Sequence, residues 1–298
     1  MTVVVDVALP RFDGAEVVIP APASGPGNWA GGASCVLVEG TYWLAYRIRR
    51  PLDAGRGISV VVARSEDGLR FSPVAEVERA AYGAASFERP AIVRTTEGWR
   101  LYLSCATPDS KHWWIEAVDA EEPAGFADGR RHIVVPGNAE WGVKDPVVLF
   151  DERGWRMWAC YHPLGDPGDE DRMISHFLTS ADGLTWTDHG PALGGTAGSW
   201  DARGARITAV LDEAPLTVLY DGRASAADNW HEVTGIAGEI GGVLVPLGDA
   251  PVAMSTEGAM GDPALRYVSV VRRSDGRARF YFEAARRDGS HDLMTSLA

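Results

Sequence analysis

The chain has 298 residues, of which 46% are hydrophobic and 23% charged, and its formal net charge is −13. This composition is typical of a globular protein that is large enough to bury a core. The negative charge argues against nucleic acid as a partner, because the phosphates would be repelled. No apolar run approaches the roughly 18–20 residues that cross a bilayer, so we expect no membrane partner either.

The cysteines and the first residues bear on compartment and metal content. Cys35, Cys105 and Cys160 are an odd number without C-x-x-C spacing, which indicates neither a disulfide framework nor a zinc site. The first six residues carry no basic side chain and include Asp6, so they do not resemble a signal peptide. We expect a cytoplasmic protein with reduced, buried thiols and with neither a metal nor a cofactor.

Five segments share one pattern: an apolar run, a short polar turn and a second run that alternates aromatic and aliphatic residues. In chain order they cover residues 34–46, 89–102, 145–158, 205–220 and 266–282. In the second and third segments the spacing from Pro to Gly-Trp-Arg is the same. Each segment reads as strand, tight turn, strand. Five such hairpins at intervals of roughly 55–60 residues predict an all-β fold, a five-bladed β-propeller.

A second repeat supports this prediction. The stretch Ser65–Phe71 recurs as Ser180–Trp186, both with the pattern Ser-x-Asp-Gly-Leu-x-aromatic. Asp-Gly between strands is a hairpin signal, because Gly tolerates the positive φ that such turns need. We place these turns between the third and outer strands of blades one and three. No segment has a convincing amphipathic helical pattern.

The repeats predict a single domain over residues 1–298. The blades cover roughly residues 28–79, 86–136, 141–193, 199–253 and 262–298, with residues 1–20 closing the last blade. We expect Val3–Val7 to form the outer strand of that blade, since this pairing would hide a sheet edge.

The loops of such a fold divide into two groups, one at each end of the channel. The turns within the hairpins are short and rich in Gly. The connections at the other end are long and polar, and they cover residues 47–57, 107–112, 161–172 and 221–232. Long polar loops on one face of a rigid scaffold are where binding and catalysis are expected.

Three candidate catalytic carboxylates stand where inner strands begin, at the mouth of the channel: Glu88, Asp145 and Asp201. Like charges held together raise one another's pKa, and neighbouring Arg or Lys lowers it. Carboxyl groups whose pKa values are split in this way can act as acid and as base. The alternative is structural, since Glu88 could pair with Arg89 and Asp145 with Lys144.

Basic and aromatic side chains surround these carboxylates. The basic ones are Arg89, Lys144, Arg203, Arg206 and Arg266. Such cations suit an anionic substrate group, or else they neutralise the acidic ring. Trp29, Trp141 and Trp200 could stack on a sugar ring or pack between blades. The remaining candidate substrate contacts on this face are His162, Asp221, Arg223 and Glu232, and no histidine pair has metal-ligand spacing.

Three features of the chain point to a known group of proteins: the five evenly spaced hairpins, the Ser-x-Asp-Gly-Leu-x-aromatic turns and the x-Asp-Pro-Val at Asp145. Through these features the chain resembles, over essentially its whole length, the five-bladed propeller glycoside hydrolases. These are the arabinanase/β-xylosidase and invertase/levansucrase families. The resemblance implies an inner-ring carboxylate trio with base or nucleophile, acid and pKa-tuning roles. One feature departs from the families: they place an essential acid on the first blade, but Trp29–Ser34 contains none. Counted from Pro, moreover, Glu88 aligns with Lys144 rather than with Asp145.

We therefore expect a glycosidase-like hydrolase for a small glycoside or sugar derivative, which can carry an anionic group, with Glu88, Asp145 and Asp201 as the trio. The expected partner is a carbohydrate-like small molecule. The alternative is a small-molecule-binding or natural-product tailoring propeller that has lost the first-blade acid and does not hydrolyse. A protein-interaction propeller is disfavoured, because neither WD nor Kelch-type repeats recur.

Overall fold

The computed structural model describes residues 7–298. In this range every regular element is a strand or a short 3-10 helix, so the fold is all-β, as the sequence predicted. The short helices are η1 (Leu52–Ala54), η2 (Arg79–Tyr82), η3 (Pro123–Asp128), η4 (Ala226–Asp228) and η5 (Ala259–Gly261). Among the described residues, no helix has the length and hydropathy needed to cross a membrane.

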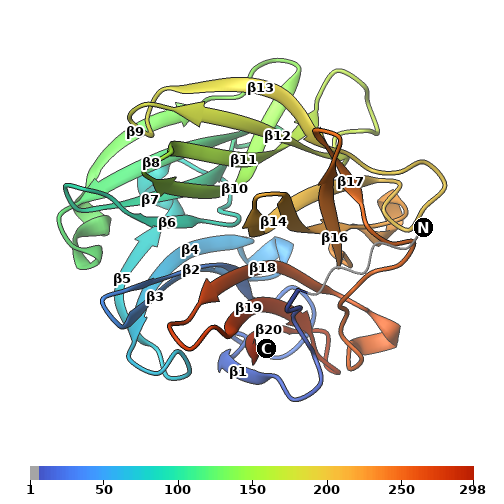
Figure 1. The fold of residues 1–298 in the computed structure, drawn as a ribbon, viewed down its shortest axis with the longest axis horizontal. Coiled ribbons are helices and arrows are strands. Elements are labelled where there is room, and N and C mark those ends of the chain that lie inside the picture. Colours follow the sequence, from blue (N-terminus) through green and yellow to red (C-terminus); the bar gives the residue numbers. More distant parts are fainter. Residues whose placement is uncertain (1–6) are drawn as a thin grey trace.

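The strands of the described residues pair in chain order as five antiparallel meanders (Figure 1). Meander 1 contains β2 (Trp29–Val38), β3 (Thr41–Arg49), β4 (Gly57–Ser65) and β5 (Ser72–Glu78). Meander 2 contains β6 (Ala91–Arg94), β7 (Trp99–Ala106), β8 (Trp113–Ala120) and β9 (Arg130–Val135). Meander 3 contains β10 (Trp141–Asp151), β11 (Gly154–Pro163), β12 (Met173–Ser180) and β13 (Trp186–Leu193).

Meander 4 contains β14 (Gly204–Glu213), β15 (Leu216–Gly222), β16 (Val233–Ile240) and β17 (Val243–Pro246). Meander 5 contains β18 (Leu265–Arg272), β19 (Ala278–Ala285) and β20 (His291–Leu297), and β1 (Glu16–Ile19) pairs antiparallel with β20 at its outer edge. The N-terminal segment therefore contributes a strand to the last meander. Of the expected strand at residues 3–7, residues 3–6 lie outside the described residues, and Val7 is not in a strand.

The hydrophobic core consists of clusters that each lie between two neighbouring meanders. Val62 of meander 1 and Leu101 of meander 2 belong to one such cluster, and further clusters join meanders 2 and 3, 3 and 4, and 4 and 5. A further cluster joins meander 5 to meander 1, with Tyr281 packed against Leu44 and Tyr42. The meanders therefore form a closed ring, and Figure 1 shows them following one another around a central axis.

Three of the five innermost strands share a bulge at equivalent positions. The cross-strand register shifts after Gly31 in β2, after Lys144 in β10 and after Arg266 in β18. The residue that follows each of them has left-handed backbone, with φ values of 64° at Gly32, 55° at Asp145 and 55° at Tyr267.

Glu88 holds the corresponding position in meander 2. Its amide N–H donates to the carbonyl of Ser104 in β7, just before the strand β6 begins. Lys144 lies opposite Cys160 in β11 in the same way. The alignment of Glu88 with Lys144, counted from Pro in the sequence, therefore holds in three dimensions.

Candidate active site

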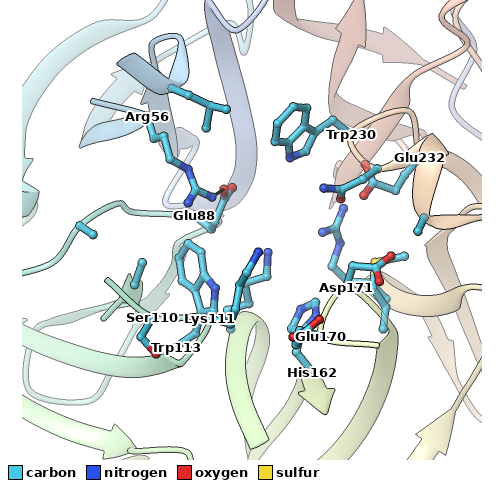
Figure 2. Close-up of a pocket in the computed structure, with 18 of the residues that line it drawn as sticks. Arg56, Glu88, Ser110, Lys111, Trp113, His162, Glu170, Asp171, Trp230 and Glu232 are labelled. Carbon is cyan, nitrogen blue, oxygen red and sulfur yellow. Dashed lines mark ion pairs between the residues drawn. The ribbon is translucent and has the colours of Figure 1, made fainter. Parts of the chain in front are cut away.

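A cavity of about 960 Å³ opens at the end of the ring where the innermost strands begin. All five meanders contribute to its wall, and Figure 2 shows side chains converging on it from every direction. The four long polar loops expected on the functional face each supply lining residues. These are Leu52 and Arg56; Thr107, Asp109, Ser110 and Lys111; His162, Glu170 and Asp171; and Arg223, Ala226, Asn229, Trp230 and Glu232.

Glu88 is the carboxylate of the predicted trio that reaches the cavity. Its side chain is 7% exposed. Arg47 of β3 forms an ion pair with its Oε2, which also lies 3.4 Å from the hydroxyl of Tyr267. The other oxygen, Oε1, has Arg56 Nη2 at 4.0 Å. Oε2 is thus held by a buried guanidinium, whereas Oε1 has only the longer contact with Arg56, which also lines the cavity.

Glu283 of β19 continues the same network behind Glu88. Its carboxylate accepts from Arg47 Nη2 at 2.8 Å and from Arg266 Nη2 at 2.7 Å, and it contacts His291 Nδ1 at 2.9 Å. Burial raises the pKa of Glu283, but Arg266 and Arg47 outweigh burial and hold this pKa well below its ordinary value. Glu283 is therefore an ionised, fully buried carboxylate.

The position of Glu283 explains the absence of an acid on the first inner strand. A Cβ atom on Gly31 would lie 1.9 Å from Glu283 Oε2 and 2.6 Å from Glu283 Cβ. No side chain fits at residue 31 while Glu283 occupies that space. At this corner of the ring the carboxylate comes from β19 and not from β2.

Glu232 is a second carboxylate in the wall of the cavity, and it is 2% exposed. It lies between Arg266, whose Nη1 is 2.5 Å from Oε2, and Arg223, which pairs with Oε1. Burial raises the pKa of Glu232, but Arg266 and Arg223 outweigh burial and hold this pKa well below its ordinary value. In Figure 2 Glu232 lies across the cavity from Glu88.

Asp145 is fully buried below the cavity floor. Its Oδ2 lies 3.1 Å from Arg206 Nη1 and 3.5 Å from Lys144 Nζ, and its Oδ1 accepts from the backbone N–H of Arg89 at 3.2 Å. Burial raises the pKa of Asp145, but Lys144 and Arg206 outweigh burial and keep this pKa below its ordinary value. Asp145 thus acts on the cavity through the two cations above it.

Asp221 shares Arg206 with Asp145. Its Oδ2 accepts from Arg206 Nη2 at 2.7 Å. Burial raises the pKa of Asp221 to about 6 in spite of this partner. The sequence predicts Asp221 as a substrate contact, but the structure buries it beneath Arg206, outside the cavity wall.

Asp201 does not join the other two carboxylates of the trio. It is 1% exposed and does not line the cavity. Its Oδ2 accepts from the Tyr220 hydroxyl at 2.9 Å, and its Oδ1 accepts from the backbone N–H of Thr196 at 3.2 Å. These contacts fix the loop that precedes β14. The sequence predicts that Glu88, Asp145 and Asp201 lie together at the mouth of the channel. In the structure, Glu88 is the one member of this trio that lines the cavity.

The predicted substrate contacts divide in the same way. Those that line the cavity are Trp29, Lys144, His162, Arg206, Arg223, Glu232 and Arg266. Burial, followed by the charge of Lys144, lowers the pKa of His162 to about 3, so this ring is neutral near pH 7.

Four further predicted contacts lie elsewhere because each has a structural partner. Arg89 donates to the carbonyls of Ala33 and Val268 and lines a separate cavity of about 280 Å³. Trp141 packs against Tyr161 and His176, and Trp200 stacks on Tyr220. Arg203 pairs with Asp169 and Asp171.

Two residues that support the cavity wall from behind were not predicted from the sequence. Arg47 and Glu283 come from second strands of hairpins, whereas the candidate carboxylates stand at the starts of first strands. A charged residue inside an apolar strand was the available signal, as in Phe280-Tyr281-Phe282-Glu283. Among the described residues, no group of three or more His, Cys, Asp or Glu side chains has a geometry suited to a metal ion.

Compared by sequence, the chain matches no family model and no curated protein. Compared by structure, it is similar to solved enzymes along nearly its full length. The α-L-arabinofuranosidase from Lactobacillus brevis aligns with a TM-score of 0.66 at 12% identity, covering 90% of this chain and 90% of that one. A β-1,2-mannobiose phosphorylase from Listeria innocua aligns with a TM-score of 0.63 at 15% identity, covering 98% and 92%.

A thermostable family-43 glycoside hydrolase aligns with a TM-score of 0.65 at 14% identity, covering 94% of this chain and 91% of that one. Identities this low bear on the fold alone. The resemblance to propeller glycoside hydrolases that the sequence indicated is confirmed for the fold.

Proposed function

We propose that residues 1–298 form one five-bladed β-propeller and that the protein is a glycosidase-like enzyme for a small sugar-derived substrate. The five meanders and the core clusters that join them in a ring support the blade count. The fold shared with an arabinofuranosidase and a mannobiose phosphorylase supports a carbohydrate-type ligand.

The observation that carries the proposed activity is that two almost fully buried glutamates, Glu88 and Glu232, line one cavity. Cleavage of a glycosidic bond commonly uses two carboxyl groups, one that protonates the leaving oxygen and one that acts as base or nucleophile. Glu232 is held ionised by Arg223 and Arg266, which suits the second role. Glu88 lines the cavity and is less tightly paired at Oε1, whose cation Arg56 lies at 4.0 Å, and we assign it the transfer of the proton.

Asp145 and Asp201 have indirect roles in this proposal. Asp145 sets the charge of the floor through Lys144 and Arg206. Asp201 holds the loop before β14 through Tyr220 and Thr196. The trio expected from the sequence thus becomes one carboxylate in the cavity and two that support it.

The alternative is a propeller that binds a sugar or a related small molecule without hydrolysing it. One observation favours it: Glu232, Glu283 and Asp145 each have two cations within 3.5 Å, whereas the second cation beside Glu88, Arg56, lies at 4.0 Å. Their pKa values are held below the ordinary range, so none of these three groups is suited to donate a proton near pH 7.

The test is to assay wild type and the variants Glu88→Gln, Glu232→Gln and Asp201→Asn on a panel of 4-nitrophenyl glycosides. Glu97→Gln is the matched control, because Glu97 is exposed and lies outside the cavity wall. Loss of an acid or base costs about 10²–10⁴ in rate, so we expect that loss for Glu88→Gln and Glu232→Gln, with Asp201→Asn mainly lowering the melting temperature.

Two outcomes would decide against the proposal. If Glu88→Gln and Glu232→Gln both turn over substrate as fast as Glu97→Gln, neither glutamate is catalytic. If wild type binds sugars in calorimetry but cleaves no glycoside of the panel, the binding alternative replaces the enzyme.

A further inference from the structure

The cavity wall contains six cationic side chains, and three of them are neutralised by carboxylates. Arg206, Arg223 and Arg266 each have a carboxylate oxygen within 2.7 Å or closer. The other three are Arg56, Lys111 and Lys144, and none of them has a carboxylate oxygen of the described residues closer than 3.5 Å.

Each of these three cations lacks a full partner within the described residues. Among residues 7–298, Arg56 has one ion pair, with Glu88 Oε1 at 4.0 Å, and Lys111 has none. Lys144 Nζ lies 3.5 Å from Asp145 Oδ2, an oxygen that already pairs with Arg206 at 3.1 Å. These side chains therefore retain N–H donors for a ligand.

Two of these cations contact one indole, and the third lies near it in the sequence. The guanidinium carbon of Arg56 lies 5.8 Å from the ring centroid of Trp113, and Lys144 Nζ lies 4.8 Å from it. Lys111 precedes Trp113 by two residues at the entry to β8. We call these four residues the Trp113 cluster. It draws on meanders 1, 2 and 3, and in Figure 2 its labelled members lie on the side of Glu88, across from Asp171 and Glu232.

The cluster has an electrostatic cost without a ligand. Arg56 Nε is buried and has no hydrogen-bond partner in the part of the chain that the structure describes, and a buried charged donor without an acceptor is destabilising. Burial lowers the pKa of Lys144 and also that of Arg56. Both side chains are therefore in surroundings that a negative charge would stabilise. Asp109 also lines the cavity and precedes Lys111 by two residues, but both side chains are exposed and they form no ion pair with each other, so solvent screens the attraction between them.

The choice of side chains points the same way. The chain has 28 Lys and Arg residues, and only two of them are lysines, Lys111 and Lys144. Both lysines line this cavity. Lysine is a compact point charge with three rotatable donors, whereas arginine presents a planar fork. Both lysines of the chain are thus placed at the cavity, together with the planar guanidinium of Arg56. Ammonium groups and a guanidinium together suit the oxygens of a carboxylate, phosphate or sulfate group.

We propose that the Trp113 cluster is an oxyanion subsite and that it binds an acidic group carried by the substrate, so that the preferred ligands are uronides or phosphorylated or sulfated sugars rather than neutral ones. The inference rests on the proposed function for the choice of a sugar as the carrier. It moves the anionic site expected from the sequence away from Arg89, Arg203, Arg206 and Arg266, which already have partners.

The two lysines permit a direct binding assay that does not depend on turnover. Reductive methylation with ¹³C-formaldehyde labels Lys111, Lys144 and the α-amine, and it leaves the positive charges in place. The full chain is titrated at constant ionic strength with methyl uronides and sugar 6-phosphates, with their neutral parent glycosides, and with inorganic phosphate alone. We expect saturable shifts of both lysine signals with the acidic sugars and none with the neutral parents.

Variants identify the subsite by calorimetry on unlabelled protein. Arg56→Gln and Lys111→Gln should each weaken binding of the acidic sugar by about 10-fold or more, since a hydrogen bond to a charged group is lost. Lys111 is exposed, so its variant should fold normally. Arg70→Gln is the matched control, because the side chain of Arg70 is 90% exposed and does not line the cavity.

The outcomes separate the inference from the proposed function. Equal binding of acidic and neutral sugars, or variants that bind like Arg70→Gln, would overturn the inference. Shifts with inorganic phosphate but not with acidic sugars would overturn the assignment of the oxyanion to the substrate. A protein that binds acidic sugars in the cluster but cleaves no glycoside would refute the proposed function alone, and a hydrolase of neutral glycosides without this binding would refute the inference alone.

Discussion

The substitution Gly31→Ala adds one methyl group in the space that the Glu283 side chain occupies. The new Cβ would lie 1.9 Å from Glu283 Oε2 and 2.5 Å from its Cδ. Gly31 does not have positive φ, so alanine causes no backbone strain here. The whole effect must come from displacing the carboxylate.

The expected cost follows from what the displaced carboxylate leaves behind. Glu283 is the shared partner of Arg47 and Arg266, and breaking a buried ion pair costs about 3–5 kcal/mol. An unfolding entropy of about 2.1 cal/mol/K per residue corresponds to about 0.6 kcal/mol/K for 298 residues. We therefore expect the melting temperature of Gly31→Ala to fall by about 5–8 °C.

Differential scanning calorimetry of wild type, Gly31→Ala and Gly194→Ala measures this shift. At Gly194 an added Cβ would meet no heavy atom within 4 Å, and this glycine does not have positive φ either. Its replacement by alanine should leave stability unchanged or raise it by about 0.4–1 kcal/mol through the unfolded state.

A melting temperature of Gly31→Ala within about 1 °C of Gly194→Ala would refute the assignment of this space to Glu283, since ordinary surface substitutions have effects of that order. A second pair of variants tests the same point in reverse. Glu283→Gly should recover part of the stability lost in Gly31→Asp, because the two changes move the carboxylate from β19 to β2. Additive effects of the two changes would contradict this coupling.

Three further predictions concern the pH dependence of stability, the reactivity of the thiols and the backbone at Trp230 in the cavity wall. The pKa of Glu283 is depressed in the folded state, so the ionised carboxylate contributes its full stabilisation above the ordinary pKa of 4.5, and this stabilisation is lost progressively as the pH falls below 4.5. The melting temperature of Glu283→Gln should therefore decline less between about pH 6 and pH 3 than that of wild type. Parallel melting curves of the two proteins against pH would contradict this. All three cysteines are buried, and burial raises the pKa of Cys160 to about 12. We therefore expect 5,5′-dithiobis(2-nitrobenzoate) to label no thiol before unfolding and dithiothreitol to leave the melting temperature unchanged. Rapid labelling of the native protein would show that a thiol is accessible. Trp230 has a φ of 80°, which glycine tolerates better than alanine, so calorimetry should find Trp230→Gly melting at or above Trp230→Ala, and the reverse order would show that the backbone relaxes on substitution.

The parts of the fold that the sequence predicts well are those set by short-range chemistry. In the turn at Ser65, the hydroxyl accepts from Gly68 N–H at 2.9 Å, and Asp67 Oδ1 accepts from Leu69 N–H at 2.8 Å. The turn at Ser180 repeats both contacts at 2.8 Å. Because each hydrogen bond spans only two or three residues, the repeated motif was enough to identify the turns.

The candidate site was predictable where position along an inner strand decides it. Glu88, Lys144 and Arg206 line the cavity because they stand at the starts of inner strands. Asp201 has a similar place in the sequence, but Tyr220 and Thr196 bind it instead. The space that Gly31 leaves open is filled by a residue 252 positions along the chain, through contacts that only the closed ring creates. Patterns within single segments carry no information on such contacts.

The network of buried ion pairs around the axis has a consequence for how this sequence can evolve. Arg47, Glu88, Glu283, Arg266 and Glu232 come from four different meanders or the loops that join them, and each takes its countercharge from another. A neutral substitution at any one of them leaves the buried charge of its partner without a countercharge. Single steps across this part of the sequence are therefore disfavoured, and drift should proceed by paired replacements. Among divergent descendants, these positions should covary with one another more strongly than with their own neighbours in the chain.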